Sequence, residues 1–134
     1  MDDTERSALE SIGIEALILF GSRAQGLEGP LSDFDFGILL SDRKMRFSPQ
    51  KRKNIYDALY DLLSAKINRL VDIDIVFLED ASMELQSHAA KYGIPLYERN
   101  PNSFARFRER VMDCYADFAP LREMFTHAIL SRIP

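Results

Sequence analysis

The sequence predicts a small α/β domain, in which a mixed β-sheet of roughly three to five strands carries helices packed mainly on one face. An apolar run over residues 16–20 is typical of a strand that is buried on both faces. A second apolar run follows a glycine-containing loop and ends at Leu40, and a third strand is predicted over 69–78 by its β-branched content. Between the last two runs, apolar residues recur at helical spacing over 55–67 and predict an amphipathic helix that begins near Pro49.

The remaining elements complete one domain over 1–134, divided into a sheet-bearing part (1–99) and a C-terminal helical arm (100–134). A first helix over 3–12 has Asp3 or Thr4 as its N-cap and ends at Gly13. A helix over 81–92 precedes a short strand at 96–97. The arm is one long helix or two helices that meet at Pro120, and its aromatic residues predict that it closes the core or pairs with another chain.

Composition narrows the class of protein. With 46% hydrophobic and 28% charged residues, the 134-residue chain is typical of a soluble globular domain, and its net charge of −4 disfavours a general nucleic-acid binder. A single cysteine, Cys114, excludes an internal disulfide and a cysteine-based zinc site. The polar start is no signal peptide, and the uncharged runs are too short to span a bilayer, so we expect a cytoplasmic protein without a membrane segment.

The loop between the first two strands carries the chemistry. Gly21 and Ser22 end the first apolar run, and Asp33 and Asp35 open the second, ten residues after Ser22. Aspartates two apart on a strand project from the same face, so this pair can hold one or two Mg²⁺ ions. A Gly-Ser turn offers backbone N–H groups to an anion such as phosphate. The alternative is a β-hairpin edge in which the aspartates are turn or capping groups.

The pattern Gly-Ser-x10-Asp-x-Asp resembles the signature of the DNA polymerase β-like nucleotidyltransferase superfamily, and it arises by chance in about one in a thousand chains of this length. The form GSRAxG followed by SDxDxGI most resembles the minimal nucleotidyltransferase (MNT) group, including antitoxins that act on HEPN-domain toxins. The resemblance implies the superfamily's catalytic palm over 1–99 and Mg²⁺-dependent transfer of AMP from ATP to a hydroxyl. Asp33 and Asp35 would bind two metal ions, and Gly21 and Ser22 would seat the triphosphate. Arg23 would contact a phosphate or lie free in solvent.

Two-metal transfer commonly needs a third carboxylate, and the third predicted strand supplies two candidates, Asp72 and Asp74. They share a face, so alternation alone does not choose between them. The resemblance favours Asp74, because the family's acid is followed by a short hydrophobic run and a polar turn. Asp74 would complete the metal ion that activates the acceptor hydroxyl.

The small size of the chain and its resemblance to the MNT group together indicate what kind of acceptor to expect. A palm without a second domain has no separate surface to grip a tRNA or a small molecule, so the acceptor is expected to bring its own. The MNT resemblance implies a HEPN toxin, an RNase that is silenced by modification of a tyrosine. Two alternatives stay open: a small-molecule nucleotidyltransferase that builds its acceptor pocket across a homodimer, and a non-catalytic antitoxin that blocks its toxin sterically.

Two further features have plainer interpretations. Six basic residues lie within 43–53. We interpret them as a solvated loop that runs into a helix, with a contact for phosphates, RNA or an acidic partner as the alternative. His88 and His127 are single histidines on helices without a second ligand at metal-binding spacing, which indicates ordinary surface or helix-face residues.

Overall fold

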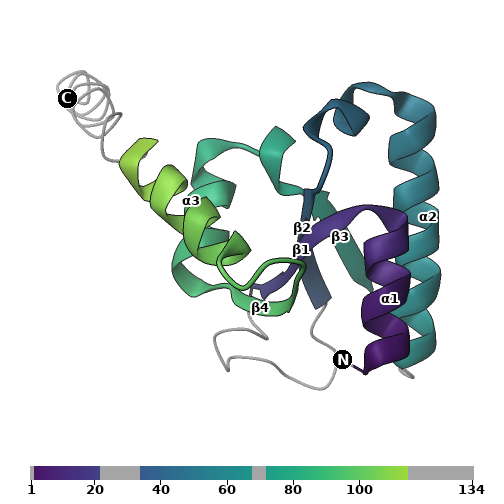
Figure 1. Ribbon diagram of the computed structural model, residues 1–134. Coiled ribbons are helices and arrows are strands. Elements are labelled where there is room, and N and C mark those ends of the chain that lie inside the picture. Colours follow the sequence, from purple (N-terminus) through teal and green to yellow (C-terminus); the bar gives the residue numbers. More distant parts are fainter. Residues whose placement is uncertain (1, 22–33, 68–71, 115–134) are drawn as a thin grey trace, which may run out of the picture.

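A computed structural model describes residues 2–21, 34–67 and 72–114 (Figure 1). Several sequence predictions fall outside these ranges: those on Ser22, Arg23 and Asp33, and those on the arm beyond 114, which includes His127. The described parts nonetheless include all of the strands discussed below and the helices that cover them.

The described strands form a four-stranded mixed sheet, which confirms the predicted fold class. The strand order is β3-β2-β1-β4; β1 runs antiparallel to both of its neighbours, and β2 runs parallel to β3. The strands are β1 (Ile14–Phe20), β2 (Phe34–Leu40), β3 (Ile73–Phe77) and β4 (Ile94–Glu98).

One face of the sheet is covered by α1 (Asp3–Ile12) and α2 (Pro49–Lys66). Leu9 of α1 and Ile55, Leu59 and Leu63 of α2 are buried against this face. The N-cap of α1 is Asp2, not Asp3 or Thr4, because the Asp2 carboxylate accepts the N–H of Glu5 at 2.8 Å.

The other face is covered by α3 (Met83–Tyr92) and by a helix over 103–114, drawn green to yellow in Figure 1. The helices therefore cover both faces of the sheet, whereas the sequence predicted them mainly on one. The physical reason is in β1, which buries Leu17 toward α1 and α2 and Ile18 toward the opposite layer. Phe104, Phe107 and Val111 are buried in that second layer, so the first part of the predicted arm belongs to the core.

The segment after β2 forms a short 3₁₀ helix, Arg43–Phe47, and leads into α2 at its N-cap Ser48. In this basic segment Lys44, Lys51 and Lys53 are exposed, in keeping with a solvated stretch. Arg52 is held over the Phe77 ring and pairs with Asp80 at 3.3 Å. No helix in the described ranges is long and apolar enough to cross a membrane.

Candidate functional site

Two of the predicted carboxylates lie side by side at one end of the sheet. Asp35 of β2 and Asp74 of β3 are direct register partners on parallel strands, and Phe20 of β1 is the partner of Asp35 on the other side. Register partners project to the same face, here the face that carries α3. Asp35 is half-buried and Asp74 is exposed, so the pair is open to a ligand from solvent.

Gly21 follows β1 directly and lies against Asp35. Its φ is +79°, a left-handed conformation that favours glycine. A Cβ added at Gly21 would overlap Oδ2 of Asp35 and lie 3.1 Å from its Cγ. The glycine predicted to let a phosphate approach the backbone thus also makes room for the Asp35 carboxylate.

Asp72 lies one residue before β3, and its carbonyl accepts the N–H of Phe34 at 2.9 Å. Its side chain is exposed. The register partner of Asp35 is Asp74 and not Asp72. The backbone of Asp72 therefore joins the start of β3 to the start of β2, two residues before Asp74.

The donor chemistry of the pair fits Mg²⁺, which takes carboxylate oxygens and completes its shell with water and phosphate. Two carboxylates that face each other across neighbouring strands also repel unless a cation lies between them. Among the described residues no three acidic, histidine or cysteine side chains form a metal-binding group. The predicted set has three members, of which Asp33 is outside the described ranges.

His88 of α3 lies close to the same end of the sheet. Its ring meets the Phe20 ring edge-on with 6.4 Å between centroids, and Tyr92 lies 5.1 Å from His88 on the next turn. From its sequence context alone, His88 is expected to be an ordinary helix residue. No spacing in the sequence could have placed it here, because the contact depends on how α3 crosses β1.

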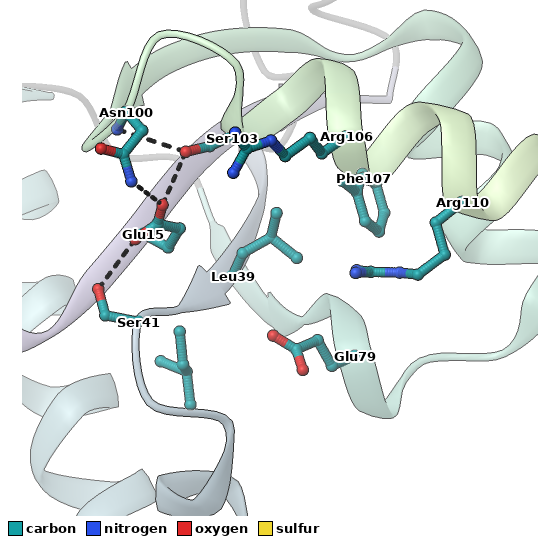
Figure 2. A pocket seen from close by; sticks show the side chains of 10 residues that line it. Glu15, Leu39, Ser41, Glu79, Asn100, Ser103, Arg106, Phe107 and Arg110 are labelled. Atoms are coloured by element: carbon teal, nitrogen blue, oxygen red, sulfur yellow. Dashed lines mark hydrogen bonds between the residues drawn. The ribbon is translucent and has the colours of Figure 1, made fainter.

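A polar hollow of about 350 Å³ lies at the opposite end of the sheet (Figure 2). Glu15, near the start of β1, accepts hydrogen bonds there from Ser41 Oγ (3.2 Å), Asn100 Nδ2 (2.9 Å) and Ser103 Oγ (2.8 Å). Burial alone would raise the pKa of Glu15, but these three bonds outweigh it and hold the pKa below its usual value. The cluster ties three chain segments together, and we interpret it as structural.

Fold and site together define the class of protein, an enzyme that transfers nucleotidyl groups: residues 6–102 match the family model "Polymerase beta, Nucleotidyltransferase". That match spans well over half of the chain. The chain belongs to the polymerase beta nucleotidyltransferase family.

One relative indicates which group within this family the chain resembles. The chain is 34% identical over 101 residues to Protein adenylyltransferase MntA of Aphanizomenon flos-aquae (strain 2012/KM1/D3), a match that covers 74% of this chain and 67% of the relative. This confirms the MNT resemblance that the Gly21 motif predicted.

Solved structures show the same fold. A crystal structure of a toxin-antitoxin with AMP-PNP contains a chain with a TM-score of 0.71 and 20% identity, over 97% of this chain and 99% of that one. A structure of tri-AMPylated Shewanella oneidensis HEPN toxin in complex with MNT antitoxin gives a TM-score of 0.63 at 17% identity, again over 97% and 99%.

Proposed function

We propose that this chain is an antitoxin that uses Mg²⁺ to transfer AMP from ATP to a tyrosine of a HEPN-family RNase toxin. The observation that carries the proposal is the pairing of Asp35 with Asp74 beside Gly21, in a chain 34% identical to a protein adenylyltransferase. The relatives reported above favour a protein acceptor over the small-molecule acceptor of the alternative hypothesis.

Asp35 and Asp74, with Asp33, are the residues that would hold Mg²⁺. The metal would neutralise phosphate charge and lower the pKa of the acceptor hydroxyl. The hydroxyl oxygen forms the new bond to the α-phosphorus of ATP, the bond to the β-phosphate oxygen breaks, pyrophosphate leaves and the hydroxyl proton passes to solvent. No side chain attacks phosphorus, so this chain contributes by positioning the metal ligands. Gly21 has no Cβ that would overlap the Asp35 carboxylate, and β3 holds Asp74 beside Asp35.

Two structural relatives support a HEPN toxin as the acceptor. One has a HEPN toxin bound to its MNT antitoxin and carrying AMP groups, and another was solved with an ATP analogue. A charged AMP group on a toxin tyrosine would disturb an RNase site by adding negative charge where RNA phosphates bind. We propose that the reaction takes place in the cytoplasm, where a cellular RNase finds both RNA and ATP. Docking of the toxin through the C-terminal arm stays a prediction.

The test combines this chain, ATP, Mg²⁺ and the HEPN protein encoded beside it, with intact-mass spectrometry of the partner. We expect one or more AMP units on a partner tyrosine, and RNase activity that stays lost after the two proteins are separated. Asp35→Asn is the matched control, and it should bind the partner without modifying it. A partner that remains unmodified, and is inhibited only while bound, would refute the hypothesis that this chain is an enzyme and would support a steric antitoxin.

A further inference from the structure

We propose that a groove between α3 and the helix over 103–114 holds the adenine base of the nucleotide, with His88 and Tyr92 as its stacking surface. The groove lies outside the carboxylate pair and the glycine turn. The inference rests on the proposed function, because it names how the ATP of that reaction is recognised.

The position of the groove relative to the carboxylates favours the nucleotide as its ligand. Asp74, Asp35 and Phe20 form one row across β3, β2 and β1, with neighbouring strands about 4.8 Å apart. His88 covers the edge of Phe20, so the groove begins one strand away from Asp35. It begins on the side away from Asp74, which is assigned to the acceptor, and on the strand that leads into Gly21. The groove therefore lies on the nucleotide side of the row.

The residues that line the groove also suit a nucleotide. The groove has a volume of about 560 Å³, within the range of small-molecule sites. Aromatic rings at His88 and Tyr92 offer a π-surface, and Lys91 and Arg108 add two cations, with Lys91 Nζ 5.4 Å from the Tyr92 ring centre. Glu84 is the single acid among the described lining residues. An aromatic ring joined to phosphate matches this combination of stacking surface and positive charge.

Tyr92 is 42% exposed although it is a large aromatic residue, and so is available to a ligand. The chain offers a matched control in Tyr60, which is 40% exposed. Tyr60 stacks on Tyr56 of α2, on the opposite layer of the sheet, so it has the same chemistry and exposure without proximity to the carboxylates.

The experiment measures binding of ATP and of inorganic tripolyphosphate by calorimetry, and the KM for ATP in the transfer assay. Because base stacking on an aromatic ring is worth about a tenfold change in affinity or more, Tyr92→Ala and His88→Ala should each weaken ATP binding about tenfold. Their affinity for tripolyphosphate, which has no base, should stay within about twofold of wild type. Tyr60→Ala should change neither. His88→Phe keeps a ring against Phe20 and should retain most of the ATP affinity.

Several results would overturn the inference. One is wild-type ATP affinity in folded Tyr92→Ala and His88→Ala; another is an equal loss for ATP and tripolyphosphate, which would indicate a general disturbance of the site. A rise in KM for the toxin with unchanged KM for ATP would instead assign the groove to the acceptor. Failure of the proposed function looks different: wild-type protein would transfer no AMP, while the calorimetric comparison of ATP with tripolyphosphate would still judge the groove.

Discussion

Replacing Gly21 by alanine separates the role of the turn in catalysis from its role in stability. The added Cβ would overlap Oδ2 of Asp35, so the carboxylate has to move by on the order of 1 Å to reach van der Waals distance. The backbone also leaves its preferred region, since a φ of +79° costs a non-glycine residue about 1–2 kcal/mol. Part of that cost is offset by about 0.4–1 kcal/mol, because alanine has less freedom than glycine in the unfolded chain.

Two magnitudes follow for Gly21→Ala. A net destabilisation of about 1 kcal/mol should lower the melting temperature by roughly 3–5 °C in a domain of this size. A misplacement of about 1 Å at a group that orients a reaction costs on the order of a hundredfold in rate. We therefore expect a folded protein with a nearly complete loss of AMP transfer, measured by pyrophosphate release alongside thermal unfolding.

Gly13→Ala is the matched control. Gly13 has a φ of +98°, so alanine meets a comparable backbone strain there. Its Cβ would lie 3.3 Å from Cε of Met45, the mobile end of a flexible side chain far from the carboxylates. Gly13→Ala should lose a similar amount of stability and keep its activity. If both variants lost activity in proportion to stability, or if Gly21→Ala transferred AMP at the wild-type rate, the argument from Asp35 would be refuted.

Three more variants test the candidate site and the stability of the fold. Asp74→Asn should lower kcat by two orders of magnitude or more while leaving ATP binding nearly intact, and Asp72→Asn should be milder; kinetics in the reverse order would assign the third carboxylate to Asp72. Glu15→Gln should lower the free energy of unfolding by about 1–3 kcal/mol at neutral pH, because an amide cannot accept all three hydrogen bonds that converge on the carboxylate. Since the folded pKa of Glu15 lies below its ordinary value of 4.5, this contribution is full above pH 4.5 and is lost as the pH falls through the folded pKa. Thermal unfolding of both proteins across that range should show the gap closing in acid, and a gap that is constant with pH would contradict it.

The strands and the helix over Pro49–Lys66 could be predicted because their signals are local. Apolar periodicity and a capped start are properties of neighbouring residues, and the structure places α2 and β1 within a residue or two of the predicted bounds. The N-cap of α1 was missed because Asp2, Asp3 and Thr4 are all capping residues and the sequence does not rank them.

The sequence could predict only part of the candidate site, because its residues are brought together by more than local pattern. The Gly21 motif marks the loop and the first carboxylates, but alternation on one strand could not separate Asp72 from Asp74. The pairing of Asp74 with Asp35 is a property of register between two strands separated by α2. The contact of His88 with Phe20 and the bonds from Asn100 and Ser103 to Glu15 likewise depend on packing between distant segments.

The register between β2 and β3 also predicts that Mg²⁺ binding stabilises the folded chain. A cation that binds between Asp35 and Asp74 needs β2 and β3 aligned, so it binds the folded chain and not the unfolded one, and it must raise the melting temperature with concentration. Without metal the two carboxylates repel, by about 0.2–1 kcal/mol for directly opposed like charges, and Asp74→Asn removes that repulsion from an exposed position with little loss of packing. Wild type should therefore gain stability when Mg²⁺ replaces Na⁺ at equal ionic strength, whereas Asp74→Asn should start at least as stable and gain little. Equal gains in the two proteins would show that Mg²⁺ binds elsewhere, and a variant less stable than wild type in chelator would show that Asp74 supports the fold rather than opposing it.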